Sequence, residues 1–151
     1  MGSSPGSWTQ VVSKIITHGK ILSIDIKPML PVKNVKFIKC DIFEQSTKEK
    51  IINFFDKKIE VIISDMAADT TGNKSLDSIR TNQLCLEILE FSSKILKPDG
   101  VFVSKLFMGD DFIEVKHLAK KIFKNVNFFK PQSSRNESKE TYLHCKTLNP
   151  L

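Results

Sequence analysis

Three aspartates that follow short apolar runs are the first residues whose placement could support chemistry. Asp25 and Asp41 each end an alternating run, and Asp65 ends the β-branched run that begins at Val61. Ligands of an open α/β sheet bind at the carboxyl ends of its strands, where carboxylates can accept hydrogen bonds from ribose hydroxyls or an exocyclic amine. Each aspartate alone could instead cap a turn. The three together favour a nucleoside pocket over coincidence.

Lys105 is the fourth candidate, because it lies in the middle of the apolar run Val103-Ser104-Lys105-Leu106-Phe107. Burial lowers the pKa of a lysine and a nearby aspartate raises it, so the balance can produce a usable general base. The alternative is an edge-strand lysine that protects the sheet against aggregation.

The chain opens with small residues, Gly2-Ser3-Ser4-Pro5-Gly6-Ser7, directly before Trp8 and a predicted helix. Such a loop suits close approach of the backbone to a ligand at a helix N-terminus. A simple tight turn would have the same composition.

The elements that must position these residues alternate along the chain. Hydrophobic periodicity predicts helices, the longest of them running from an Asp77 N-cap to Leu96, between short strands. This alternation is typical of βαβ units and predicts a Rossmann-like α/β fold, with a mainly parallel sheet and helices on both faces. The predicted helices are 8–18, 47–55, 77–96 and one from about 110, and the predicted strands are 20–25, 35–40, 61–63, 101–107, 126–129 and 141–145.

The composition is that of an ordinary globular protein. The 151 residues are 40% hydrophobic and 26% charged, which predicts one domain over residues 1–151. No apolar run approaches the roughly 20 residues that span a bilayer. The three cysteines lack metal-site or disulfide spacing, which favours a reducing cytoplasmic location. The net charge of +6 permits a polyanionic partner.

Four motifs are distributed over essentially the whole chain. They are Pro5-Gly6-Ser7-Trp8, Ser64-Asp65-Met66-Ala67, Val103-Ser104-Lys105-Leu106-Phe107, and Lys130-Pro131-Gln132-Ser133-Ser134-Arg135 followed by Ser138-Lys139-Glu140-Thr141-Tyr142. In these motifs, their order and their spacing, the chain resembles the FtsJ-like ribose 2′-O-methyltransferases. Within that family the resemblance is greatest to the bacterial enzymes that methylate a uridine of large-subunit ribosomal RNA.

The resemblance implies S-adenosylmethionine as cofactor. It places Gly6 and Trp8 in the first cofactor loop, Asp25 at the ribose and Asp41 at the adenine amine. Asp65 would border the methionine end and also belong to the catalytic set.

The resemblance further implies that Lys105 is the general base that takes the proton of the 2′-hydroxyl, with Glu140 as an auxiliary member of the catalytic set. A surface glutamate before a strand is the plain alternative for Glu140. Arg135 and Lys139 are the candidates for RNA phosphates. Methyl transfer from a sulfonium needs alignment and proton removal and no metal. We therefore expect a cytoplasmic, monomeric enzyme acting on ribosomal RNA or the large ribosomal subunit, without membrane or metal.

The chain departs from the family pattern in two motifs and at its beginning. The glycine pair before the tryptophan is Gly6-Ser7, and Ala68-Asp69 stands where the family has Pro-Asn. The family also has an N-terminal segment with another catalytic lysine and the sheet's first strand, whereas this chain starts inside the glycine loop. We therefore expect an N-terminally truncated chain, weakly stable or inactive alone. The alternatives are the same chemistry on transfer RNA or an mRNA cap, and a non-catalytic cofactor- or RNA-binding remnant.

Overall fold

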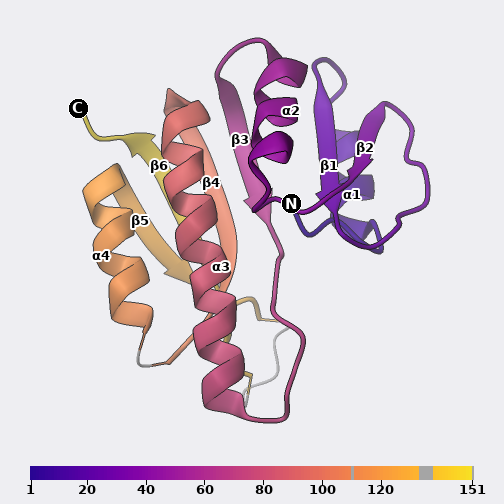
Figure 1. Cartoon of the computed structure of the whole chain (residues 1–151). Coiled ribbons are helices and arrows are strands. Elements are labelled where there is room, and N and C mark those ends of the chain that lie inside the picture. The colour runs from indigo at the N-terminus through magenta and orange to yellow at the C-terminus, as the bar shows by residue number, and fades with distance from the viewer. Residues whose placement is uncertain (110, 133–137, 151) are drawn as a thin grey trace. The chain divides into compact units, whose positions relative to one another are not determined.

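The computed structural model describes residues 1–109, 111–132 and 138–150. The chain divides into two compact units, Met1–Lys57 and Lys58–Leu151. The first unit contains helix α1 (Ser7–Ile15), strands β1 (Ile21–Asp25) and β2 (Val35–Lys39), and helix α2 (Gln45–Phe55) (Figure 1).

Strands β1 and β2 of the first unit form a parallel pair, in register from Ile21 opposite Val35 to Asp25 opposite Lys39. Helix α1 is joined to β1 by a buried hydrogen bond between the hydroxyls of Thr9 and Ser23, 2.9 Å apart. Because the two strands are parallel, their carboxyl ends lie at the same edge of this small sheet.

The second unit is a four-stranded sheet with two helices. Strand β3 pairs parallel with β4, and β6 runs antiparallel to both β4 and β5, in the order β3-β4-β6-β5. Strand β5 therefore points the same way as β3 and β4, but its pairing with β6 and that of β4 with β6 are antiparallel, so this sheet is mixed rather than mainly parallel. The elements are β3 (Ile59–Ser64), α3 (Lys74–Ile95), β4 (Leu96–Phe107), α4 (Phe112–Ile122), β5 (Phe123–Phe129) and β6 (Glu140–Leu148).

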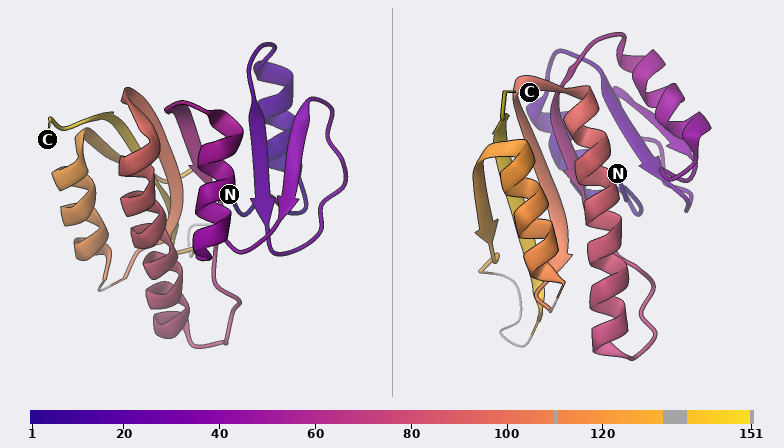
Figure 2. Two further views of the ribbon diagram at one scale, coloured as in Figure 1. Left: turned by 45° about the horizontal axis from the view of Figure 1, so that its top comes forward. Right: turned by 60° about the vertical axis from the view of Figure 1, so that its left-hand side comes forward.

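Helices α3 and α4 cover one face of this sheet, as the right-hand view of Figure 2 shows. Successive side chains of β4 alternate between the two faces. Phe102 and Leu106 are fully buried on the helix side, where the Phe102 ring stacks on Phe123 at a centroid distance of 6.2 Å. The alternation therefore places Lys105 on the opposite face.

Helix α3 begins earlier than the sequence predicts. Its N-cap is Asn73, whose side-chain oxygen accepts hydrogen bonds from the N–H groups of Ser75 and Leu76. The predicted cap, Asp77, was wrong, because its carboxylate instead accepts hydrogen bonds from the Thr71 N–H at 2.8 Å and hydroxyl at 2.7 Å. Asp77 therefore holds the preceding loop onto the first turn of the helix.

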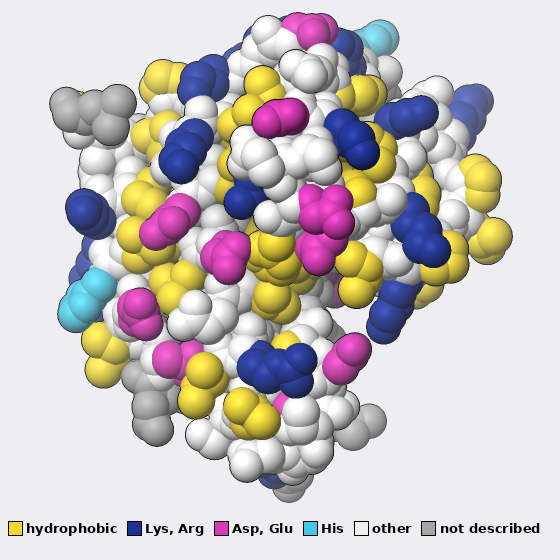
Figure 3. All heavy atoms as spheres, in the orientation of Figure 1, with side chains coloured by type: hydrophobic (Ala, Val, Ile, Leu, Met, Phe, Trp, Pro, Cys, Tyr) yellow, Lys and Arg dark blue, Asp and Glu magenta, His cyan; other side chains and the backbone are white. Residues whose placement is uncertain are grey.

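The outer surface of α3 and α4 has a mixed charge. A hollow of about 420 Å³ between the two helices is lined by Glu87, Glu90 and Glu114 together with His117 and Lys121 (Figure 3). Among the residues that the structure describes, no helix is long and apolar enough to cross a membrane, and no group of three metal-ligating side chains gathers.

Candidate active site

Lys105 lies at the centre of a charged cluster in the second unit. Its Nζ is 2.8 Å from Glu140 Oε1 and 3.0 Å from Asp65 Oδ1. The side chain of Lys105 is only 12% exposed, and those of Asp65 and Glu140 are 25% and 34% exposed. The structure therefore brings together the three residues that the resemblance implies for catalysis.

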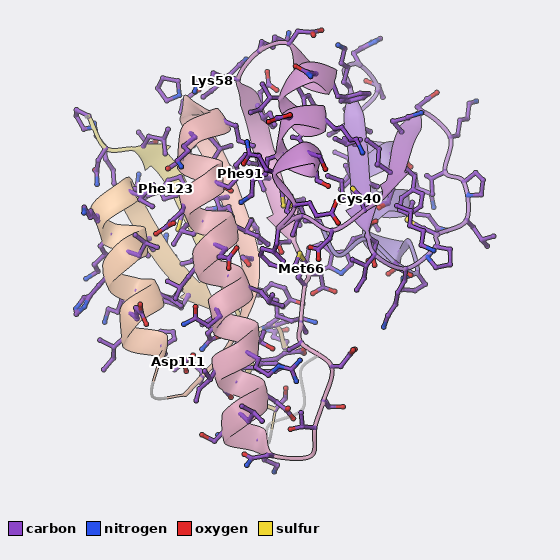
Figure 4. The ribbon with its side chains drawn as sticks, in the orientation of Figure 1. Cys40, Lys58, Met66, Phe91, Asp111 and Phe123 are labelled. Atoms are coloured by element: carbon purple, nitrogen blue, oxygen red, sulfur yellow. The ribbon has the colours of Figure 1, made fainter. Side chains whose placement is uncertain are left out.

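The sheet register explains why these residues meet. Lys105 lies opposite Tyr142 on β6, and Phe107 lies opposite Glu140, so these four side chains share one face. Asp65 directly follows the last residue of β3, at the point where the chain leaves the strand beside Met66 (Figure 4). A strand end, a strand interior and a strand start thus supply the cluster.

The position of Lys105 within the sheet decides between its two interpretations. Strand β4 pairs with β3 on one side and β6 on the other. Lys105 lies one residue beyond the last β3 pair, but β4 is an interior strand and the lysine side chain is only 12% exposed. Protection against edge-to-edge aggregation therefore does not explain it.

The pKa of Lys105 is raised above its ordinary value. Burial of the ammonium group lowers the pKa, but the hydrogen bonds and negative charges of Glu140 and Asp65 raise it by more. The two carboxylates thus outweigh the effect of burial, and Lys105 carries a proton at neutral pH.

Tyr142 is a member of the cluster that sequence reasoning missed. Its hydroxyl donates a hydrogen bond to Asp65 Oδ1 at 3.0 Å. Burial, the negative charge of Asp65 and this hydrogen bond raise the pKa of Tyr142. The spacing in the sequence could have identified Tyr142. It follows Glu140 by two residues in a predicted strand, and residues two apart in a strand share one face.

The candidate cofactor residues of the first unit lie at the carboxyl end of its two strands. Asp25 ends β1, and its two carboxylate oxygens accept hydrogen bonds from the N–H groups of Ser4 and Lys27, each at 2.8 Å. The Ser3 N–H also donates to the Ile24 carbonyl at 3.2 Å. The opening loop is therefore bound to the end of β1.

Asp41 and the glycine loop complete this group. Asp41 follows β2 by two residues, and its Oδ1 accepts a hydrogen bond from the Phe43 N–H at 2.9 Å. Gly6, the N-cap of α1, has φ of 124°, a conformation that favours glycine, and a Cβ there would lie 3.2 Å from Met29 Cγ. Trp8 is 39% exposed in the first turn of α1.

The two candidate RNA-binding residues differ in what can be described. Arg135 lies outside the described residues. Lys139 is exposed directly before β6, and its carbonyl accepts a hydrogen bond from the Met108 N–H at 2.9 Å.

Comparisons with known proteins show which family the chain resembles in sequence and fold. The chain is 46% identical over 148 residues to ribosomal RNA large subunit methyltransferase E of Pelagibacter ubique, covering 98% of this chain and 73% of the relative. It is 45% identical over 149 residues to the enzyme of the same name from Rickettsia akari, covering 95% of this chain and 66% of that relative. The chain thus spans about two thirds to three quarters of these relatives.

Solved structures show the same fold. A ribosomal RNA methyltransferase from Plasmodium falciparum has a TM-score of 0.86 at 33% identity, covering 97% of this chain and 83% of that one. Human methyltransferase-like protein 13 has a TM-score of 0.72 at 17% identity, over 97% and 69% of the two chains, and supports the fold alone. The predicted Rossmann-like methyltransferase fold is therefore confirmed. The family model described as FtsJ-like methyltransferase matches residues 1–148, and the chain belongs to that family.

Proposed function

We propose that this chain transfers a methyl group from S-adenosylmethionine to a ribose 2′-hydroxyl of ribosomal RNA, at a uridine of the large subunit. The observation that carries the proposal is the position of Lys105 Nζ, 2.8 Å from Glu140 and 3.0 Å from Asp65. Membership of a methyltransferase family supports the reaction class, and the names of the relatives support ribosomal RNA as the substrate.

The catalytic role proposed for Lys105 is that of the base for the attacking hydroxyl. S-adenosylmethionine supplies an electrophilic methyl group on a sulfonium, so the protein must align the ribose oxygen and accept its proton. Asp65 and Glu140 fix the direction of the lysine side chain. Because they also raise its pKa, Lys105 must release its own proton before it can accept another, and the neutral amine is then a strong base.

The nucleoside part of the cofactor is assigned to the first unit. Each oxygen of Asp25 accepts one backbone N–H and keeps a further lone pair for a ribose hydroxyl. Asp41 uses Oδ1 for the Phe43 N–H, which leaves Oδ2 to accept from the adenine amine. Gly6 and Trp8 lie in the loop and first helical turn proposed to approach the cofactor.

The RNA is assigned to the face of the second unit that carries Lys105. Lys139 is exposed directly beside Glu140 in sequence, and phosphate contacts are the default use of such a cation. Arg135 is proposed for the same role on its sequence position alone. The opposite face is less suitable for phosphates, because three glutamates line the hollow between α3 and α4 (Figure 3). A monomer that works in the cytoplasm on the large ribosomal subunit completes the proposal.

The test is a methyl-transfer assay with radiolabelled S-adenosylmethionine. The RNA substrates are large ribosomal subunits, protein-free large-subunit RNA and transfer RNA. Wild-type protein is compared with Lys105→Ala and with Lys120→Ala, an exposed lysine of α4 that serves as the matched control. We expect label in alkali-resistant dinucleotides of large-subunit RNA, lost in Lys105→Ala and retained in Lys120→Ala.

Three results would contradict parts of the proposal. Label on a base would exclude ribose as the acceptor. Label on transfer RNA in preference to ribosomal RNA would replace the substrate. Equal rates for wild type and Lys105→Ala would remove Lys105 from the reaction.

A further inference from the structure

The last residues of β4 extend beyond the strand that pairs with them on one side. The β3 pairing ends at Ser64, opposite Ser104. On the other side, the Met108 N–H donates to the Lys139 carbonyl at 2.9 Å. Because the residues of an antiparallel ladder alternate in direction, the N–H and C=O of Phe107 point away from β6, to the side that β3 no longer occupies.

The side chain of Asn82 takes the place of a strand at this point. Its Nδ2 donates to the Phe107 carbonyl and its Oδ1 accepts from the Phe107 N–H, both at 2.9 Å. A primary amide offers a donor and an acceptor side by side, as a strand residue does. Asn82 is fully buried in α3, so water cannot replace these two bonds at the same low cost.

Thr81, the residue before Asn82 in α3, makes a similar hydrogen bond to the backbone of the segment that follows Asp65. The Oγ1 of Thr81, also fully buried, accepts a hydrogen bond from the Ala68 N–H at 3.1 Å. Ala68 follows Asp65 by three residues, and Phe107 follows Lys105 by two. Two adjacent residues of α3 thus bind the backbone just after Asp65 and just after Lys105.

We propose that Asn82, assisted by Thr81, is a positioning residue for the proposed methyl transfer, because it fixes the end of β4 and with it the alignment of Lys105 against Asp65 and Glu140. The inference rests on the proposed function for its catalytic consequence, while the alignment itself is independent of turnover. The geometry matters because a displacement of about 1 Å at a reacting group can cost on the order of 100-fold in rate.

A purely structural role for Asn82 is the competing explanation, since any buried amide must be hydrogen-bonded. The two roles differ in what they change at Lys105. Loss of stability alone leaves the folded molecules with an unchanged Lys105 environment. Loss of alignment separates Lys105 from Asp65 and Glu140, the carboxylates that raise its pKa, and from Tyr142, which faces it from β6.

The test compares Asn82→Leu, which keeps the side-chain size without the two hydrogen bonds, with Leu89→Ala, a fully buried position two turns further along α3. The pKa of Lys105 is measured by NMR of 13C-labelled lysine Cε, with Lys105→Arg to assign the signal. We expect a raised pKa in wild type and in Leu89→Ala. In Asn82→Leu we expect the pKa to fall toward the ordinary value of about 10.4, together with a kcat lower by roughly 100-fold and a KM for S-adenosylmethionine within about twofold.

The outcomes separate this inference from the proposed function. A raised pKa that Asn82→Leu leaves unchanged would overturn the positioning role and leave the Lys105 cluster intact. An ordinary pKa for Lys105 in wild type would show that the lysine is not held by Asp65 and Glu140, and would contradict the cluster on which the proposed function depends. If Asn82→Leu does not fold, Thr81→Val replaces it, because it removes only the hydrogen bond from the Ala68 N–H. The same fall in the pKa of Lys105 and in kcat supports the inference, and values equal to those of wild type overturn it.

Discussion

At the scale of single residues, the candidate site is one cation held by two carboxylates, with a tyrosine hydroxyl bound to one of them. Lys105 is placed between Asp65 and Glu140, and Tyr142 donates to the same Asp65 oxygen that Lys105 contacts. Two donors on one oxygen fix the Asp65 carboxylate in direction. The arrangement can therefore hold an amine rigidly, and its cost is that the amine is harder to deprotonate.

The first prediction at this scale concerns pH. Because the pKa of Lys105 is raised above the ordinary lysine value of about 10.4, the neutral base is a small fraction of the enzyme below that pH. If Lys105 is the base, kcat should rise about tenfold per pH unit from neutral pH to pH 10 without levelling off. Single-turnover rates measured across this range test it, and a plateau reached near pH 8 would contradict it. Lys105→Arg keeps the charge but cannot lose its proton, so it should show no such rise.

The second prediction concerns the hydrogen bond from Tyr142 to Asp65. Tyr142→Phe removes a bond to a charged acceptor in a half-buried site, which should lower the free energy of unfolding by about 1.5–3 kcal/mol. Urea denaturation of Tyr142→Phe, Asp65→Ala, which removes the accepting oxygen, and the double variant measures the coupling. Because both single changes disrupt the same bond, the double variant should lose less stability than the two together. Strictly additive losses would show that the two side chains do not interact.

At the scale of elements, the sequence predicted what local pattern controls. The apolar run around Lys105 and the alternation of strands and helices were sufficient to predict the strands and a sheet with parallel pairs, such as β3 with β4. They did not predict that β6 runs antiparallel to both of its neighbours. The cap of α3 was mispredicted because Asn73 and Asp77 are equally suitable residue types, and the choice depends on where Thr71 lies. Asn82 left no signal at all, because its partner is the backbone of Phe107, 25 residues away in sequence.

The cap of α3 gives the third prediction. Asn73 accepts hydrogen bonds from two N–H groups of the first turn, so Asn73→Ala should lower the free energy of unfolding by about 0.5–2 kcal/mol. Asn73→Asp retains the accepting oxygen and serves as the matched control. Urea denaturation of both variants tests this. A loss in Asn73→Asp equal to that in Asn73→Ala would show that something other than the cap bond was removed.

The two faces of the second sheet give the fourth prediction. Phe102 on β4 is fully buried beneath the helices, whereas Phe129 on β5 is 59% exposed. Phe102→Ala should therefore cost about 3–5 kcal/mol of unfolding free energy, a large part of the roughly 5–15 kcal/mol typical of a domain. Phe129→Ala, the same change on the same sheet, should cost far less. Denaturant midpoints with equal m-values test the difference, and similar losses at both positions would contradict the assigned core.

At the scale of the whole molecule, the chain contains two sheets, and within the described residues β1 pairs only with β2 and β3 only with β4. The sequence could not show this division, because strand partners are chosen among elements far apart in the chain. A single methyltransferase domain over residues 1–151 remains our proposal. It requires that the first unit, with the proposed cofactor residues, and the second unit, with Lys105, unfold together.

Thermal unfolding with S-adenosylhomocysteine is the measurement at this scale. A ligand at about 100 times its Kd adds about 2.7 kcal/mol to the stability of the state that binds it, which raises the Tm of a chain of this size by roughly 5–10 °C. We expect one cooperative transition that rises by this amount. Two transitions, of which only one rises, would divide the proposed domain. A Tm that is the same with and without the ligand would contradict the proposed cofactor site.

A pair of aspartate variants in the first unit makes this last prediction specific. Asp41 Oδ1 is occupied by the Phe43 N–H, so Asp41→Asn keeps that bond and presents an NH₂ group where Oδ2 would accept from the adenine amine. We expect Asp41→Asn to raise the Kd for S-adenosylhomocysteine about tenfold, which corresponds to about 1.4 kcal/mol of binding free energy. The ligand should therefore raise the Tm of this variant by less than it raises the Tm of wild type. Asp56→Asn is the control, because Asp56 has φ of 59°, which asparagine tolerates, and an exposed ion pair with Lys20. An equal loss of response in both variants would show that general negative charge, rather than the Asp41 carboxylate, governs ligand binding.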